Sequence, residues 1–162
     1  KKKLKDELKM FFSKKKNKKP ELLEKSNIIV NCKADSKEEV IRRIGKMLVD
    51  SGYVKDDYID GMLKREETFA TNIGNEIAIP HGIEDAKKQV KKSGIAVMAF
   101  PDGVIWNDDE KVRLVIGIAG VGDEHLEILG NIAENFSTIE EVDKLIDSND
   151  INYIYNKFTQ GV

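Results

Sequence analysis

Two histidines are the side chains best suited to covalent chemistry in this sequence of 162 residues. His81 lies in Ile-Ala-Ile-Pro-His-Gly (77–82), directly after a short apolar stretch that predicts a strand. Sites in α/β proteins form at the carboxyl ends of strands, and a helix starting near Ile83 would direct backbone N–H groups toward an anion there. The positive end of that helix also favours the neutral, nucleophilic imidazole. The position fits a nucleophile beside a site for an anion such as a phosphoryl group, and it fits a structural histidine as well.

His125 follows the most apolar stretch of the chain, in Gly-Val-Gly-Asp-Glu-His (120–125). It falls in the first turn of the next predicted helix. At helical spacing it shares a face with Leu129, Ile132 and Phe136. The side chain therefore lies either in the core or in a cleft.

Arg65 stands in an apolar face of a predicted helix, with Tyr58, Met62 and Phe69 at helical spacing. An unpaired charge is costly to bury, so this arginine needs an anion. Its planar fork suits a phosphoryl oxygen or a carboxylate. The alternative is a salt bridge, for instance with Glu66.

Other kinds of site lack their motifs. The sequence contains neither G-x-G-x-x-G nor a Walker loop, so a nucleotide site is not expected. The two histidines are 44 residues apart and show no zinc-ligand spacing. The single cysteine, Cys32, excludes an internal disulfide, fits a reducing compartment and is predicted to be a small buried hydrophobic residue. We therefore expect neither a metal nor a cofactor.

The apolar patterns predict a single α/β domain with a mixed, mostly parallel sheet of about five strands and helices on both faces. The expected strands are 28–30, 77–80, 94–100 and 112–119, with a turn at 101–103. The expected helices are one from Ser36 to Gly52, then 55–69, 83–90, 123–136, 138–147 and 150–158. Capping boxes at Ser36 with Glu39 and at Thr138 with Glu141 mark two helix starts.

Charge divides the chain into two parts. Residues 1–25 carry eleven lysines against four acidic residues, and we interpret them as a basic linker or extension. The spacing of Leu4, Leu8, Phe11 and Phe12 leaves open an amphipathic helix for a membrane surface or a neighbouring domain. The rest of the chain carries 16 basic against 25 acidic side chains, which argues against nucleic acid as a partner and favours a basic protein or a small ligand. No apolar run is long enough to insert into a membrane.

Several segments together resemble one known family. They are Gly-Tyr-Val (52–54), Tyr-Ile-Asp-Gly-Met-Leu-Lys-Arg-Glu (58–66) and Asn-Ile-Gly-Asn-Glu-Ile-Ala-Ile-Pro-His-Gly (72–82). These are similar to the fructose/mannitol family of enzyme IIA domains of the phosphoenolpyruvate-dependent sugar phosphotransferase system. Phe-Pro-Asp-Gly-Val (100–104) and the stretch 113–119 followed by Glu-His (124–125) look like its mannitol branch. The resemblance implies one such domain over residues 26–160.

The resemblance also implies roles for the three residues considered above. His81 would be the phosphorylated nucleophile, reacting through Nε2. His125 and Arg65 would stabilise the phosphoryl group, together with backbone N–H groups near Gly82. The donor would be phospho-HPr, and the acceptor would be a cysteine of a IIB domain, free or fused to a membrane IIC domain. The protein would then act in the cytoplasm or at the inner face of the membrane.

Two other functions stay open from the sequence. The first is a regulatory domain of the same family, in a transcription regulator or a nitrogen-regulation system, where His81 would report phosphorylation state. The second is a metal-dependent hydrolase that uses His81, His125 and acidic residues. Glu124-His125 favours a transport protein of the mannitol branch over the regulatory domain. Acceptance of the phosphoryl group by IIB would separate the transport protein from the regulatory domain.

Overall fold

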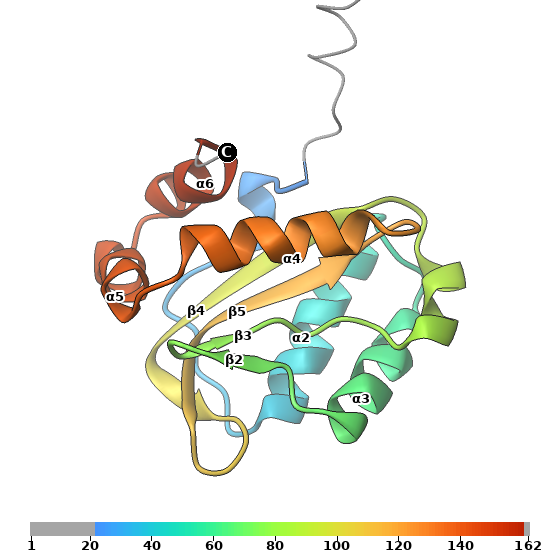
Figure 1. Cartoon of the computed structure of the whole chain (residues 1–162), viewed down its shortest axis with the longest axis horizontal. Coiled ribbons are helices and arrows are strands. Elements are labelled where there is room, and N and C mark those ends of the chain that lie inside the picture. Colours follow the sequence, from blue (N-terminus) through green and yellow to red (C-terminus); the bar gives the residue numbers. More distant parts are fainter. Residues whose placement is uncertain (1–21, 161–162) are drawn as a thin grey trace, which may run out of the picture.

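The computed structural model describes residues 22–160, in which a five-stranded sheet lies between two layers of helices (Figure 1). The predicted basic extension, including its amphipathic helix, lies almost entirely outside these residues. The strands in spatial order are β1 (Ile28–Ile29), β4 (Gly94–Ile105), β5 (Lys111–Ala119), β3 (Ile77–Ala78) and β2 (Asn72–Gly74). The pairs β1–β4 and β3–β5 are parallel, whereas β4–β5 and β2–β3 are antiparallel. The predicted five-stranded mixed sheet with helices on both faces is confirmed.

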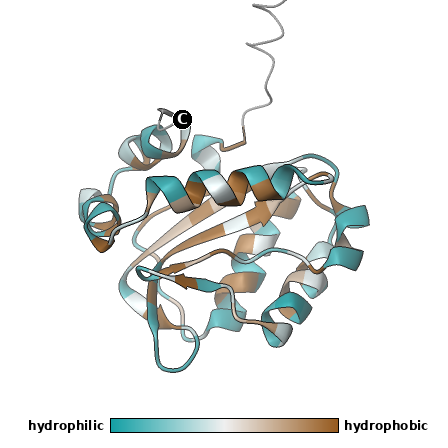
Figure 2. Ribbon diagram, in the orientation of Figure 1, coloured by the Kyte–Doolittle hydropathy of each residue, from teal (hydrophilic) through white to brown (hydrophobic). Residues whose placement is uncertain are grey.

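The helices divide between the two faces of the sheet. One face carries α2 (Lys37–Asp50), α3 (Tyr58–Thr68) and the 3-10 helix η2 (Glu84–Gln89), and the other carries α4 (Glu124–Asn135), α5 (Ile139–Ser148) and α6 (Ile151–Gln160). A short 3-10 helix, η1 (Lys25–Asn27), precedes β1. Hydrophobic residues line the inner sides of both layers (Figure 2). Within residues 22–160, none of the helices is long and apolar enough to cross a membrane.

The centre of the sheet shows why its strands read as continuous apolar runs. Along β5, Leu114 and Ile116 pack with α4–α6, while Val115 and Ala119 pack with α2 and α3. Successive side chains of a strand point to opposite faces, so a strand covered on both sides needs apolar residues at every position. Gly117 interrupts the run because a Cβ there would lie 2.9 Å from Ile44 Cγ1 of α2.

Helix starts follow the predicted caps. The Ser36 hydroxyl accepts a hydrogen bond from the Glu39 N–H at 3.2 Å, and Thr138 accepts one from the Glu141 N–H at 3.4 Å. These contacts satisfy donors that the first helical turn leaves without partners. Cys32 is 5% exposed, as expected for a small hydrophobic residue in the core.

The predicted turn at 101–103 is wrong. β4 continues through it to Ile105, and the chain reverses at residues 106–110, where the Trp106 N–H donates to Glu110 O at 2.8 Å. The ladder shifts register between Ala99 and Val104, which accommodates Gly103 at φ +76° as a bulge rather than a turn. The short edge strand β2 was also missed, because only three residues form it.

Candidate functional site

His81 lies at the carboxyl ends of two parallel neighbours, β3 and β5. The Ile118 N–H of β5 donates to Pro80 O at 2.9 Å, and His81 itself forms a β-bridge with Ile118. The Ile79 N–H donates to Thr71 O at 3.0 Å on the other side. The backbone just before His81 is therefore held from both sides by neighbouring chain segments.

The tautomer of His81 is fixed by a backbone carbonyl two residues earlier in the chain. Its Nδ1 lies 2.8 Å from Ile79 O, and because a carbonyl can only accept, Nδ1 carries the proton. Nε2 then keeps a free lone pair. Burial lowers the pKa of His81 below its ordinary value of 6.5. The positive charges of Arg65 and His125 lower this pKa further, against the opposing effects of Ile79 O and Glu66. The geometry gives a neutral imidazole with a nucleophilic Nε2.

His125 stands in the first turn of α4, half-buried. Its Nδ1 lies 3.2 Å from Gly122 O, so this ring too directs its Nε2 away from its own backbone. The glycine at position 120 allows His125 to lie this close to the end of β5. A Cβ on Gly120 would lie 2.5 Å from His125 Cβ and 2.6 Å from His125 N. The residue that follows β5 thus has to be glycine for the start of α4 to approach it.

Arg65 belongs to α3 and has no carboxylate partner among the described residues. Its Nη1 donates to Phe69 O at 2.7 Å, and its guanidinium lies 5.9 Å from the centre of the Phe69 ring. The alternative of a salt bridge with Glu66 is not found. The Glu66 carboxylate is 5% exposed and accepts hydrogen bonds from Trp106 Nε1 at 2.7 Å and from the Thr71 hydroxyl.

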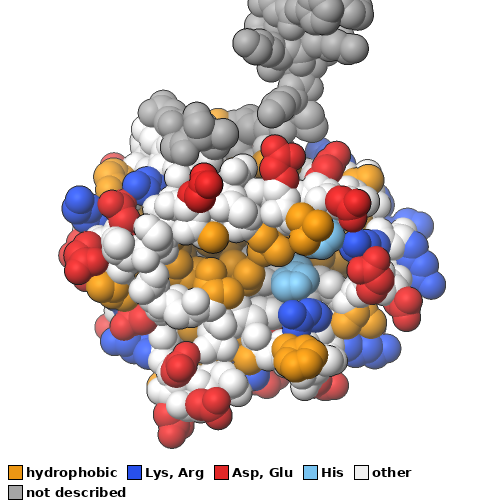
Figure 3. All heavy atoms as spheres, in the orientation of Figure 1, with side chains coloured by type: hydrophobic (Ala, Val, Ile, Leu, Met, Phe, Trp, Pro, Cys, Tyr) orange, Lys and Arg blue, Asp and Glu red, His pale blue; other side chains and the backbone are white. Residues whose placement is uncertain are grey.

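One cleft of about 270 Å³ brings the three predicted residues together. It is lined by Tyr58, Arg65, His81, Gly82, Ile83, Glu84, Lys87, Ile118, Gly120 and His125. On the surface, the pale-blue histidine side chains and a blue cationic side chain gather in a hollow beside α4 (Figure 3). Two imidazole rings and a guanidinium around one cavity can receive a phosphoryl group or a similar anion.

The backbone N–H groups predicted to face this anion are already engaged. The Gly82 N–H donates to the Tyr58 hydroxyl at 2.9 Å, and the Ile83 N–H donates to Gly61 O at 3.2 Å. The predicted helix is a 3-10 helix of six residues. The Gly82 and Ile83 N–H groups are therefore not free to contact an anion in this structure, because they join the cleft loop to α3.

Two residues that line the cleft, Tyr58 and Lys87, were given no role in the site by the sequence analysis. Tyr58 is 3% exposed, and its hydroxyl donates to Ile118 O at 2.7 Å. Burial raises the pKa of Tyr58 to about 12, with the Gly82 N–H acting in the opposite direction. Lys87 lines the cleft and pairs with Glu84 at 3.1 Å. The tyrosine was already noted on the face of Arg65, whereas a lysine in a lysine-rich stretch gave no signal.

Comparison with known proteins decides the family. The sequence profile described as "Phosphoenolpyruvate-dependent sugar phosphotransferase system, EIIA 2" matches residues 21–161. The chain belongs to this family. The family resemblance found in the sequence is thereby confirmed, as is the prediction that the chain is a phosphotransferase component. The EIIA 2 profile spans all the residues that form the cleft.

Individual members of the EIIA family resemble this chain over most of its length. A protein of Geobacillus stearothermophilus named mannitol-specific phosphotransferase enzyme IIA component is 50% identical over 125 residues, covering 77% of this chain and 86% of its own. A protein of Bacillus subtilis with the same name is 45% identical and covers 85% of this chain and 98% of its own.

Solved structures agree with the sequence matches. The crystal structure of IIA mannitol from Escherichia coli has a TM-score of 0.79 at 34% identity, covering 85% of this chain and 99% of its own. An NMR structure titled as the complex of enzyme IIAMTL with phosphorylated enzyme IIBMTL from Escherichia coli has a TM-score of 0.80 at 33% identity, covering 85% and 97%.

Proposed function

We propose that this chain is the mannitol-type phosphocarrier of its phosphotransferase system. His81 takes a phosphoryl group from phospho-HPr and passes it to a cysteine of a IIB domain, on the cytoplasmic side of the membrane. The observation that carries this proposal is the cleft itself, in which a neutral His81 with a free Nε2 stands beside Arg65 and His125. The relatives from Geobacillus stearothermophilus and Bacillus subtilis, both named mannitol-specific, support the sugar class.

The first transfer replaces one P–N bond by another. The lone pair on His81 Nε2 attacks the phosphorus, and the P–N bond of the donor phosphohistidine breaks with its electron pair returning to the donor nitrogen. Nδ1 of His81 keeps its proton throughout, so the phosphorylated ring is positively charged. Ile79 O, 2.8 Å from Nδ1, stabilises that charge. In the second transfer the IIB thiolate attacks the phosphorus and the pair returns to Nε2.

Arg65 and His125 stabilise the phosphoryl oxygens during both steps. Arg65 keeps donors free because its hydrogen bond to Phe69 O uses Nη1 alone, and no carboxylate within residues 22–160 neutralises it. His125 can donate from Nε2 when that nitrogen is protonated, since Gly122 O lies beside the other nitrogen. Removing one such donor typically lowers a rate by ~10²–10³-fold. These side chains do the work expected earlier of the backbone N–H groups.

Exposed apolar side chains beside the cleft suit a transient partner. Phe69 is 71% exposed next to Arg65, Leu126 is 59% exposed next to His125, and Val121 is 43% exposed between β5 and α4. Orange side chains accordingly lie around the histidines in Figure 3. Small interfaces with an apolar centre suit partners that dock and leave quickly. HPr and IIB would use this same surface in turn.

The test is phosphoryl transfer in a reconstituted chain of proteins. Phosphoenolpyruvate, enzyme I and HPr are incubated with wild-type protein, His81→Gln and His125→Gln, and the intact mass is recorded before and after acid. The wild type is expected to gain one acid-labile phosphoryl group, His125→Gln to gain it more slowly, and His81→Gln to gain none. Adding a mannitol IIB domain should then discharge the wild type. No gain by the wild type from charged HPr contradicts the proposal, and a charged protein that IIB cannot discharge contradicts its transport part.

A further inference from the structure

Besides the bond between the His81 ring and Ile79 O, four hydrogen bonds join the backbone around His81 to other segments, and one of these four uses a side chain. Three join main-chain atoms: Ile79 N–H to Thr71 O, Ile118 N–H to Pro80 O, and Ile83 N–H to Gly61 O. The fourth joins the Gly82 N–H to the Tyr58 hydroxyl at 2.9 Å. A substitution at Tyr58 is therefore the one way to remove a bond from this set without changing the loop itself.

The Tyr58 hydroxyl has fixed roles in this arrangement. Its single proton is donated to Ile118 O at 2.7 Å, so the oxygen can only accept from Gly82. Both partners border His81, one from the end of β5 and one from the next residue in the chain. With the side chain 3% exposed and its pKa raised to about 12, the hydroxyl stays protonated at neutral pH.

Packing prevents the loop from sliding along the tyrosine. A Cβ on Gly82 would lie 2.7 Å from Tyr58 Cε1, so the ring rests directly against the glycine backbone. Ala86 of η2 also packs closely on Gly61 of α3. A Cβ added to Gly61 would lie 2.5 Å from the Cβ of Ala86. α3 and the segment 82–86 thus form one packed unit.

We propose that Tyr58 is a positioning residue for His81. Its hydroxyl bridges the Gly82 N–H and Ile118 O, and this bridge holds the Pro80–Gly82 turn in the conformation in which His81 Nδ1 donates to Ile79 O. The bridge also occupies the Gly82 N–H, which is then not available to the phosphoryl group. This role rests on the proposed function of His81 as phosphoryl acceptor.

The position of Tyr58 on α3 links it to a second group of the cleft. Tyr58 begins the helix and Arg65 lies two turns further along the same face. A helix that is bonded to the His81 loop through its first residue carries the guanidinium at a fixed offset from the imidazole. Phosphoryl transfer needs such alignment, because a misplacement of ~1 Å can lower a rate by ~10²-fold.

The experiment compares Tyr58→Phe with Tyr53→Phe. Tyr53 is an equally buried tyrosine, 1% exposed, whose hydroxyl donates to Glu24 at 3.4 Å away from the cleft. The ¹⁵N chemical shifts of the His81 ring report its tautomer in each folded protein, and single-turnover transfer from phospho-HPr reports the rate. Tyr58→Phe is expected to populate the Nε2–H tautomer of His81 and to slow transfer by about 10-fold to 100-fold. Tyr53→Phe should match the wild type in both measurements.

Two readouts keep this proposal separate from the proposed function. Wild-type ¹⁵N shifts together with a wild-type transfer rate in Tyr58→Phe would overturn the positioning role. A loss of thermal stability in both tyrosine variants with unchanged His81 shifts would also overturn it, because a purely structural role moves stability and leaves the tautomer alone. If the wild type itself accepts no phosphoryl group, the proposed function fails, and the tautomer measurement still decides whether Tyr58 holds His81.

Discussion

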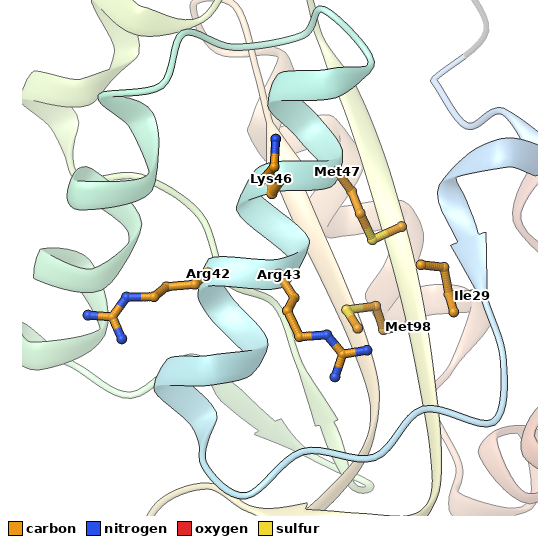
Figure 4. A pocket seen from close by; sticks show the side chains of 6 residues that line it. All are labelled: Ile29, Arg42, Arg43, Lys46, Met47 and Met98. Atoms are coloured by element: carbon orange, nitrogen blue, oxygen red, sulfur yellow. The ribbon is translucent and has the colours of Figure 1, made fainter.

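Two of the cavities within residues 22–160 invite comparison because cations line both of them, yet the larger of the two lacks the groups for chemistry. The cavity between α2, β1 and β4 measures about 410 Å³, against about 270 Å³ for the His81 cleft. Its lining residues are Ile29, Arg42, Arg43, Lys46, Met47 and Met98 (Figure 4). Ile29 and the two methionines form an apolar floor, and Figure 4 shows Arg42 extending away from it. Neither a histidine nor a cysteine lines this cavity.

The cations of the two cavities also differ in how they are engaged. Arg43 donates to Lys33 O at 2.8 Å, and Lys46 pairs with Asp50 at 3.0 Å. In the His81 cleft, hydrogen bonds instead fix the proton of an imidazole and leave its other nitrogen free. Positive charge alone can attract an anion, but a covalent transfer needs a nucleophile whose lone pair is held in place. The fixed tautomer, and not the volume, distinguishes the His81 cleft from the larger cavity.

A matched pair of arginines gives the strongest test of this comparison. Arg65→Gln should lower the rate of transfer from phospho-HPr by ~10²–10³-fold, since it removes a donor to the phosphoryl oxygens. Arg43→Gln removes the same charge from the larger cavity, where the arginine also donates to a backbone oxygen, and should leave the rate unchanged. Single-turnover kinetics measures both. Equal losses in the two variants would mean that only the general positive charge of the domain matters.

A pair of glycines tests whether the position of His125 matters. Gly120→Ala places a methyl group 2.5 Å from His125 Cβ, so α4 must shift and transfer should slow by about 10-fold through misplacement of the imidazole. Gly130→Ala meets nothing within 4 Å and lies in the same helix, so it should raise stability by about 1 kcal/mol and leave transfer intact. Thermal melting and transfer rates are recorded for both. A wild-type rate in Gly120→Ala would contradict the role of His125.

The pH dependence follows from the lowered pKa of His81. Its imidazole remains neutral, and therefore nucleophilic, as the pH falls through the ordinary histidine value of 6.5. Phosphoryl acceptance should accordingly persist below that value and decline only at the lower pKa of the folded protein. The lowered pKa also makes the stability of the fold depend on pH. The free energy of unfolding decreases as the pH falls from the pKa of His81 in the unfolded chain toward its pKa in the folded protein, because the unfolded chain binds the proton more tightly. An acceptance rate that halves at pH 6.5 or above would contradict the burial of His81.

The smallest expected effect on the transfer rate comes from Lys87, which we compare with its neighbour Lys88. Lys87 lines the cleft and its partner Glu84 has an 83% exposed side chain, so the pair is weak and the ammonium can turn to an incoming phosphoryl group. Lys87→Gln should slow transfer by about 2–5-fold, the size expected of an exposed ion pair. Lys88→Gln, on the exposed neighbour that does not line the cleft, should have no effect. Identical rates for the two variants would remove Lys87 from the site.

The sequence could predict features that depend on local periodicity. The face shared by Tyr58 and Arg65, the cap at Ser36 and the apolar strand that ends before His125 all follow from spacing along the chain. Gathering His81, His125 and Arg65 in one cleft was implied by the family resemblance, and the cleft of the structure contains all three.

Features that depend on distant partners could not be predicted in this way. The Gly82 N–H is taken by a tyrosine 24 residues earlier in the chain, and nothing local to Gly82 signals that contact. Strand β4 continues past Pro101 because its pairing with β5 shifts register there instead of ending. That shift depends on the partner strand and not on the residues of the predicted turn. Glu66 likewise pairs with a distant residue. Its carboxylate accepts from Trp106, 40 residues away, and not from its neighbour Arg65.

The most direct test of the account is to locate the phosphoryl group on its atom. The protein, labelled with ¹⁵N at its histidines, is charged by phospho-HPr and observed by ¹⁵N and ³¹P NMR. We expect a phosphoryl group on Nε2 of His81, with Nδ1 still protonated and His125 unmodified. A phosphoryl group on Nδ1 of His81, or on His125, would contradict it, because the bond between Nδ1 and Ile79 O would then not determine which nitrogen reacts.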